Sequence, residues 1–99
     1  MSISAGEVAV PHAVTVAVSG DTLAVDFADG RTVAVPTAWF PRLLHATPAE
    51  REDWRLLAAG EGIHWPNLDE DISVESLLAG RRSAESQASL KRWLASRPA

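Results

Sequence analysis

A histidine followed closely by three carboxylates is the group of residues in this chain whose types could support chemistry. His64 precedes Asp69, Glu70 and Asp71. Brought into one pocket, such side chains could transfer protons or hold a metal ion. The chain has no cysteine and only 3 histidines, and no second histidine or cysteine stands at a metal-ligand spacing from His64. We therefore assign no catalytic, cofactor-binding or metal-binding residue and no cofactor. A small enzyme or ligand-binding protein centred on His64 with Asp69 or Asp71 is kept as an alternative function.

The acidic run also has a structural explanation. Asp69, Glu70 and Asp71 come just before Ser73, which we expect to cap a short helix over residues 74–78. Acidic side chains near a helix N-terminus interact favourably with the helix dipole. A calcium-binding loop needs a ligand spacing and a central glycine that this segment lacks. We therefore expect the run to stabilise the start of the helix or to meet a guanidinium, and not to bind a cation.

Tryptophan is abundant, with 4 in 99 residues. A buried aromatic side chain supplies about 150–250 Å² to a small core, and an exposed tryptophan is a frequent hot spot of protein interfaces. We expect Trp39 and Trp65 to lie in the core, with the Trp65–Pro66 loop as a rigid platform. Trp93 lies in a basic terminal segment, where we predict an exposed anchor or a dimer contact.

The net charge of −4 conceals two segments of opposite charge. Residues 61–80 carry 5 acidic and no basic residues, and residues 81–99 carry 5 basic residues and 1 acidic residue. Their charges of −5 and +4 have two interpretations: the basic tail docks on the acidic segment, or the two form separate surfaces for two partners. A basic helix could also bind nucleic acid phosphates, but the chain has no helix-turn-helix pattern.

Several protein classes are disfavoured by what the chain lacks. No apolar run reaches the ~20 residues of a transmembrane helix, and the N-terminus has no signal-peptide pattern. Glycine-rich phosphate loops, the Gly-x-Ser-x-Gly elbow and the His-Glu-x-x-His motif are absent. We therefore expect a cytoplasmic protein that does not interact with a membrane.

The N-terminal part of the chain predicts antiparallel strands. Asp29-Gly30 indicates a tight hairpin turn, because glycine tolerates the positive φ that such a turn needs. Pro36 ends the last strand, since proline cannot donate a backbone hydrogen bond. The period-two patterns typical of strands cover residues 13–18, 23–27 and 32–35.

Short helices and a loop are expected in the rest of the chain. We predict a helix over residues 38–46, and Thr47-Pro48-Ala49-Glu50 is a capping box that opens a second one. Residues 55–58 fit either a continuation of that helix or a strand. Residues 60–68 show no helical period and few strand signals, which favours a loop. Ser83 then caps a last helix over residues 84–95.

Residues 60–78 resemble the hallmark of a known family. They read Gly60-Glu61-Gly62-Ile63-His64-Trp65-Pro66-Asn67-Leu68-Asp69-Glu70-Asp71-Ile72-Ser73-Val74-Glu75-Ser76-Leu77-Leu78. The family is catalogued as bacterial domain of unknown function number 2442. Its hallmark is Gly-Ile-His-Trp-Pro, then Asp-Glu-Asp, a hydrophobic residue, Ser-Val and Leu-Leu. The resemblance covers about residues 10–80, because three upstream segments are also similar to the family: Asp29-Gly30-Arg31, Trp39-Phe40-Pro41-Arg42-Leu43 and Ala46-Thr47-Pro48-Ala49-Glu50-Arg51.

The resemblance implies a compact α+β domain. We expect a small antiparallel sheet, made by the N-terminal strands and their hairpin, packed with short helices and followed by a C-terminal helix. Residues 8–80 would form this family-like domain, and residues 81–99 a basic C-terminal helical extension of the same domain. Family members often resemble partners of small toxin-like proteins in bacterial operons. Some carry an added helix-turn-helix domain, for which the one helix after Gly80 is too little.

These observations favour a small non-enzymatic protein-binding module, antitoxin-like or a regulatory partner in a bacterial operon. A small basic protein would bind the acidic 61–75 segment and its aromatic neighbours. A homodimer is an alternative, since a second copy could cover strand edges. A nucleic-acid-associated module acting through the basic C-terminal helix is a weaker alternative. The candidate partner-binding residues are His64, Trp65, Asp69, Glu70, Asp71 and Trp93.

Overall fold

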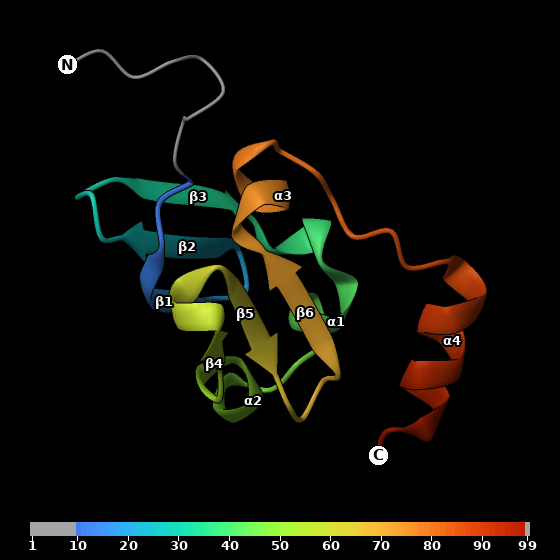
Figure 1. The fold of residues 1–99 in the computed structure, drawn as a ribbon. Helices are drawn as coiled ribbons and strands as arrows, with labels where there is room; N and C mark the ends of the chain where they lie inside the picture. The colour runs from blue at the N-terminus through green and yellow to red at the C-terminus, as the bar shows by residue number, and fades with distance from the viewer. Residues whose placement is uncertain (1–9, 99) are drawn as a thin grey trace, which may run out of the picture.

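The computed structural model describes residues 10–98, which form an α+β fold with two antiparallel three-stranded sheets (Figure 1). The first sheet has the strand order β1-β2-β3, and the second has the order β4-β5-β6. The predicted fold class is confirmed, and the second sheet is an addition to it. The strands are β1 (Ala13–Val18), β2 (Thr22–Phe27), β3 (Thr32–Pro36), β4 (Arg55–Leu57), β5 (Gly62–Trp65) and β6 (Glu70–Ser73).

Short helical segments connect the sheets and follow them. The C-terminal helix α4 stands to one side of both sheets and is reached through an extended segment after α3 (Figure 1). No helix within residues 10–98 is both long and apolar enough to cross a membrane. The helical segments are η2 (Thr37–Trp39), α1 (Pro41–Leu44), α2 (Pro48–Glu52), η3 (Ala58–Gly60), α3 (Val74–Leu78) and α4 (Gln87–Ser96).

The expected N-terminal strands and the capping box are confirmed. Strands β2 and β3 pair antiparallel with Leu23 opposite Val35, and Gly30 in the turn between them has a φ of 92°. At the start of α2, the Thr47 side chain accepts a hydrogen bond from the Glu50 N–H. The Glu50 side chain in turn accepts one from the Thr47 N–H. Both features could be read from local sequence because each depends on residues at most a few positions apart.

The loop predicted over residues 60–68 is wrong in its first half. Gly62–Trp65 is strand β5, the central strand of the second sheet. Ile63 and Trp65 are buried, and Gly62 and His64, which alternate with them, are less so, which is the period of two that a strand requires. The flanking Gly60 and Pro66 concealed this short period. Residues 55–57 form β4, so the strand alternative is the correct one there.

Two predicted helices and the place of the acidic run also differ from expectation. The helix predicted over residues 38–46 is split into η2 and α1, because Phe40 between them has a φ of −126°. Ser73 caps α3 as predicted, but the acidic run before it lies in a turn and in β6 rather than at the start of the helix. The last helix begins at Gln87, and its N-cap is Ser86 instead of Ser83. The predicted domain start at residue 8 lies outside the described residues.

One cluster of buried side chains joins both sheets. Leu23 and Val25 from the first sheet and Ile63 and Trp65 from the second are all fully inaccessible to solvent. Helix α4 contributes no buried residue, and its Trp93 is packed only partly against the cluster. The remaining core side chains are Ala13, Val16, Phe27, Val35, Phe40, Leu43, Ala46, Leu68, Ile72, Val74 and Leu77.

Gly60 allows the two sheets to approach each other at β1. Its φ is 100°, and a Cβ placed on it would lie 2.5 Å from the carbonyl oxygen of Ala13. Only glycine satisfies both the positive φ and this close backbone contact. The connection between β4 and β5 therefore depends on Gly60 to lie directly against the first sheet.

Candidate functional site

The register of β5 and β6 divides the acidic run between the two faces of the second sheet. His64 is opposite Asp71, and Trp65 is opposite Glu70. Because side chains alternate along a strand, Asp71 faces outward beside His64, and Glu70 lies on the inner face beside buried Trp65. The Nδ1 atom of His64 contacts the Asp71 carboxylate, and the two side chains are 30% and 67% exposed. This contact is therefore a surface pair.

Trp65 is a core residue. Its side chain is fully buried, and its indole Nε1 donates a hydrogen bond to the carbonyl oxygen of Arg51 at 3.1 Å. The core position predicted for it is confirmed. A partner could reach Trp65 only if the core opened, so its side chain is not part of the accessible surface.

Asp69 is exposed at the tip of the β5–β6 hairpin. Its φ of 49° lies in the left-handed region, which aspartate tolerates better than most residues. The hairpin tip is held from below by Arg42, whose Nη1 donates to the carbonyl oxygen of Leu68 at 2.9 Å. The side chain of Asp69 thus points outward from a backbone that Arg42 fixes through its hydrogen bond to the Leu68 carbonyl.

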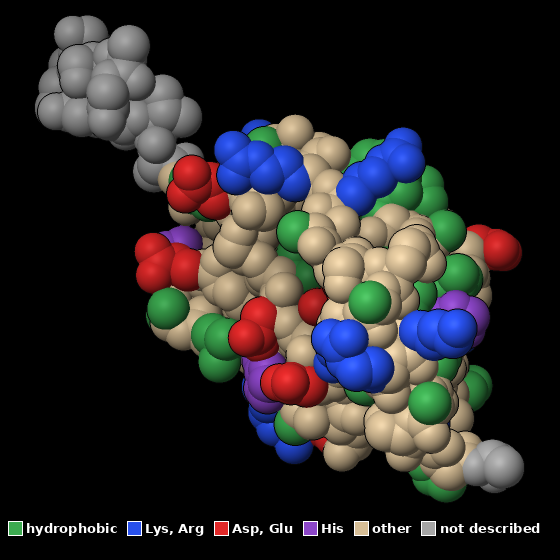
Figure 2. All heavy atoms as spheres, turned by 90° about the vertical axis from the view of Figure 1, so that its right-hand side faces the viewer, with side chains coloured by type: hydrophobic (Ala, Val, Ile, Leu, Met, Phe, Trp, Pro, Cys, Tyr) green, Lys and Arg blue, Asp and Glu red, His purple; other side chains and the backbone are tan. Residues whose placement is uncertain are grey.

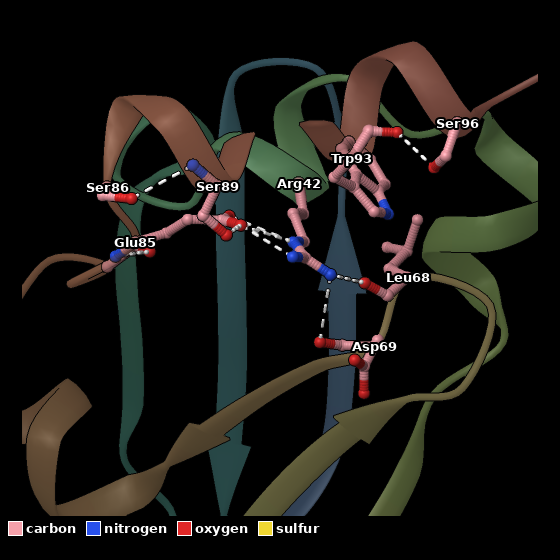
Figure 3. Close-up of polar contacts among 9 residues, drawn as sticks. Arg42, Leu68, Asp69, Glu85, Ser86, Ser89, Trp93 and Ser96 are labelled. Atoms are coloured by element: carbon pink, nitrogen blue, oxygen red, sulfur yellow. Dashed lines mark hydrogen bonds and ion pairs between the residues drawn. The ribbon is translucent and has the colours of Figure 1, made fainter. Parts of the chain in front are cut away.

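Arg42 is the centre of a polar network between α1, the hairpin tip and the segment before α4 (Figure 3). Its Nε and Nη2 atoms donate to the Glu85 carboxylate, with Nη2 to Oε2 at 2.7 Å. Ser89 also donates to Glu85, at 2.7 Å. These hydrogen bonds lower the pKa of Glu85 and raise that of Arg42. The pair is largely shielded from solvent, with 15% and 11% of the two side chains exposed.

A second ion pair holds the end of α4. Arg97 Nη2 donates to Glu50 Oε1 at 2.6 Å, and this bond lowers the pKa of Glu50 to about 2. The Trp93 ring lies between the two ion pairs, with the guanidinium carbon of Arg42 at 5.2 Å and that of Arg97 at 4.5 Å from its centroid. Both distances permit cation–π attraction. Trp93 is thus partly buried and engaged within the chain, so the predicted exposed anchor is wrong, and the alternative of a dimer contact stays a prediction.

The two predicted interpretations of the basic tail can now be compared with its contacts. The tail docks, but chiefly on α1 and α2, where acidic Glu85 meets Arg42 and basic Arg97 meets Glu50. The exposed basic side chains on α4, Lys91 and Arg92, form no ion pair with a described residue. Figure 2 faces this side of the molecule and shows basic side chains over α4 with acidic and histidine side chains beside them.

A groove of about 660 Å³ separates β6 from the segment that leads to α4. Among the residues that line it, Glu70 has a raised pKa and an unpaired buried oxygen atom. Burial raises the pKa of Glu70 to about 7, with Glu85 acting in the same direction and Arg42 opposing it. Its Oε2 atom is buried and has no hydrogen-bond partner among the residues that the structure describes. The groove is lined by Phe40, Arg42, Asp69, Glu70, Asp71, Ile72, Ser73, Ser76, Arg81, Arg82, Ser83, Ala84, Glu85 and Ser89.

The arrangement around His64 is chemically simple. Of the three predicted carboxylates, Asp71 is the one hydrogen-bonded to the imidazole. Proton transfer by a histidine needs a substrate held within hydrogen-bond reach, and metal binding needs further ligands. Within residues 10–98, no group of three or more histidine and acidic side chains could hold a metal ion. The pair can serve as a polar contact for a partner.

Sequence patterns did not indicate the roles of Arg42 and Glu85. They are 43 positions apart, and neither belongs to a motif that specifies an ion pair. Arg42 belongs to a segment that resembles the family pattern, Trp39-Phe40-Pro41-Arg42-Leu43. That resemblance does not indicate which residue Arg42 contacts. The position of Glu85 in the basic tail was the one available signal, because it is the single acid there.

The comparisons with known proteins agree with this fold. A family described as "Protein of unknown function (DUF2442)" has a sequence model that matches residues 13–83. The chain belongs to the DUF2442 family. The resemblance based on the Gly-Ile-His-Trp-Pro segment is thereby confirmed at the level of the family.

Two solved structures are similar to this DUF2442 chain. One is the crystal structure of a protein of unknown function from Rhodospirillum rubrum, whose sequence is 29% identical to this chain. The two structures have a TM-score of 0.64, and the match covers 81% of this chain and 96% of the other. An uncharacterized protein from Chromobacterium violaceum, solved by NMR in solution, is 22% identical with a TM-score of 0.63, over 88% and 76% of the two chains. No curated protein matches the chain significantly. The second likeness concerns the fold alone.

Proposed function

We propose that this protein is a small non-enzymatic protein-binding module that takes a basic protein partner. The observation that carries the proposal is an acidic surface around β5, β6 and α3. Glu61, Asp69 and Glu75 are exposed and form no ion pair with another described residue. Asp71 is also exposed and contacts only the neighbouring His64 by its side chain. A basic partner would find these charges available.

The same surface offers an apolar contact. Leu57 on edge strand β4 is 42% exposed and is opposite Gly62, so its side chain lies on the outer face with His64 and Asp71. Complementary charges accelerate encounter, whereas buried apolar anchors slow dissociation. With Trp65 in the core and Trp93 engaged by two arginines, Leu57 replaces the tryptophans as the proposed anchor.

The biological setting is part of the proposal. Family members resemble partners of small toxin-like proteins, so we infer an antitoxin-like or regulatory role in a bacterial operon, exercised in the cytoplasm. Small toxins that act on nucleic acids are commonly basic, because they must approach phosphates. An acidic protein surface is suited to such a partner. The exposed Lys91 and Arg92 on α4 would lie outside this interface.

Co-purification from the native host with mass spectrometry tests the proposal. The tagged full chain should retain one specific basic protein. The variant Asp69→Asn/Glu75→Gln should retain much less of it, because it removes two exposed negative charges. The control variant Asp21→Asn/Glu52→Gln removes two exposed charges elsewhere and should retain as much as wild type. Recovery of no specific partner, or equal retention by both variants, contradicts the proposal.

A further inference from the structure

Strand β6 has a free edge that faces a groove. It is the last strand in the order β4-β5-β6, and all residues from 69 to 73 line the 660 Å³ groove. Unpaired strand edges are templates for pairing with another extended chain. The opposite wall is the segment from 81 to 85, so the edge is partly enclosed and not open to solvent along a flat surface. The site can therefore receive a single extended chain.

The hydrogen-bond pattern shows which backbone groups of β6 face the groove. The Val74 N–H donates to the Glu61 carbonyl at 3.0 Å, so Val74 belongs to a hydrogen-bonded position of the antiparallel pair. Such positions alternate along the ladder. Asp71 and Ser73 therefore direct their backbone groups away from β5. The Asp71 carbonyl and the Ser73 N–H have no hydrogen-bond partner among residues 10–98.

The Glu70 side chain in the same groove has an oxygen atom without a hydrogen-bond donor. Its buried Oε2 atom accepts no hydrogen bond from a described residue. Arg42 is close, but its guanidinium is occupied by Glu85 and by the carbonyl oxygen of Leu68. A buried acceptor without a donor is destabilising, and a donor that arrives with a ligand relieves that cost. The Glu70 carboxyl is therefore arranged to take a donor from outside the chain.

We propose that the groove binds an extended segment of a partner protein, which pairs with the free edge of β6 and places a lysine or arginine side chain against Glu70. This inference rests on the proposed protein-binding function and names the contact through which it acts. Pairing would use the Asp71 carbonyl and the Ser73 N–H. The ammonium or guanidinium group would donate to the Glu70 carboxyl, after a rotation of this side chain that brings the buried Oε2 atom to the groove surface.

The charge balance of the groove selects a basic segment. Arg42 is neutralised by Glu85, and Arg81 and Arg82 lie on the opposite wall, with Arg82 over the Trp39 ring at 4.9 Å. With four acidic and three basic side chains, the lining keeps a net negative charge. Along β6, Glu70 stands between two exposed carboxylates, those of Asp69 and Asp71. A cation beside Glu70 compensates the charge of that carboxylate and is attracted at longer range by Asp69 and Asp71, of which Asp71 lies on the other face of the sheet. The pKa of Glu70 is raised because its burial outweighs the opposing effect of Arg42.

A random seven-residue peptide library displayed on phage, panned on the immobilised full chain, tests this inference. Enriched peptides should contain a lysine or arginine among residues that favour extended structure. Their binding to Glu70→Gln should be weaker by roughly tenfold or more. The control Glu52→Gln removes an exposed carboxylate outside both the groove lining and the acidic surface and should bind like wild type. In NMR spectra of the wild-type chain, the amide signals of Asp71 and Ser73 should shift on addition of peptide.

Three outcomes overturn the inference. They are the absence of enriched peptides, equal binding to wild type and Glu70→Gln, and amide shifts confined to another surface. Shifts of β6 that grow with protein concentration and need no peptide show that a second copy occupies the edge, which also overturns it. The proposed function fails separately, when co-purification recovers no basic partner. A partner that binds Glu70→Gln normally but not Asp69→Asn/Glu75→Gln leaves the function in place without the groove.

Discussion

Arg42 Nη2 and Glu85 Oε2 lie 2.7 Å apart, and this ion pair joins helix α1 to the segment that precedes α4. The same guanidinium binds the hairpin tip through Leu68 and lies over Trp93. Arg42 thus contacts the acidic hairpin, the groove wall and the C-terminal helix at once, and the Arg97–Glu50 pair holds the far end of that helix. The arrangement explains how an element with no buried residue, α4, keeps a defined position.

Replacing Arg42 by alanine should detach α4. The ion pair is largely shielded, so its loss leaves Glu85 with only Ser89 as a donor and removes the Arg42 donor from the Leu68 carbonyl, and we expect about 2 kcal/mol of destabilisation. Amide hydrogen exchange across residues 87–96 should accelerate, and chemical denaturation should report the lower stability. Arg31→Ala is the control, because its pair with Asp29 is exposed at 59% and 43%. That variant should lose clearly less stability than Arg42→Ala, because an exposed ion pair contributes little. Equal losses in the two variants contradict the role given to Arg42.

Gly60→Ala should destabilise the fold severely. The added Cβ would meet the Ala13 carbonyl oxygen at 2.5 Å, and the φ of 100° is itself unfavourable for alanine. We expect a loss of about 2–4 kcal/mol in urea unfolding. Gly30→Ala is the matched control, since Gly30 has a φ of 92° but nothing within 4 Å of its added Cβ. It should lose about 1–2 kcal/mol. A Gly60→Ala loss no larger than that of Gly30→Ala would show that the contact with Ala13 is unimportant.

Glu70 should make the protein less stable as the pH rises towards 8. Its pKa is raised to about 7 in the folded chain, against an ordinary value of 4.5. Between these values the folded state binds more protons than the unfolded state, so stability falls as pH rises through this window. Glu70→Gln should remove the dependence and stabilise the protein at pH 8 by about 1 kcal/mol, given partial screening by solvent. Unfolding curves at pH 5 and pH 8 check this; an unchanged pH dependence in Glu70→Gln contradicts it.

Arg97→Ala should act in the opposite pH direction. Arg97 lowers the pKa of Glu50 to about 2 from an ordinary value of 4.5. The stabilisation is therefore fully present above about pH 4.5 and is lost as pH falls towards 2. At pH 7 the variant should be less stable by about 1 kcal/mol, and the difference from wild type should disappear in acid. An NMR titration should show the Glu50 pKa returning towards 4.5 in the variant. A Glu50 pKa that stays near 2 would assign the shift to another group.

Local signals in the sequence predicted part of this fold. The turn at Asp29-Gly30 and the cap at Thr47 depend on neighbouring residues, so both could be recognised before the structure. Strand β5 could not be recognised from the sequence, since a four-residue strand between Gly60 and Pro66 offers only two buried positions, Ile63 and Trp65. Its assignment requires β4 and β6, which pair with it from both sides.

The candidate site was predicted in its composition but not in its geometry. The acidic run was identified, yet the inward position of Glu70 follows from the β5–β6 register, which depends on long-range pairing. The engagement of Trp93 depends on Arg42, far away in sequence, and on Arg97. Side chains that meet only through the tertiary fold leave no periodic signal in the sequence, which is why the groove was not foreseen.

The central claim is that the exposed carboxylates on the hairpin and α3 bind a basic partner. It is tested most directly by the dissociation constant of the co-purified partner, measured for three chains at low and high salt. Asp69→Asn/Glu75→Gln should bind roughly tenfold more weakly than wild type at low salt, with a smaller salt dependence. Asp21→Asn/Glu52→Gln should bind like wild type. Equal dissociation constants for all three chains, with no effect of salt, would contradict the claim.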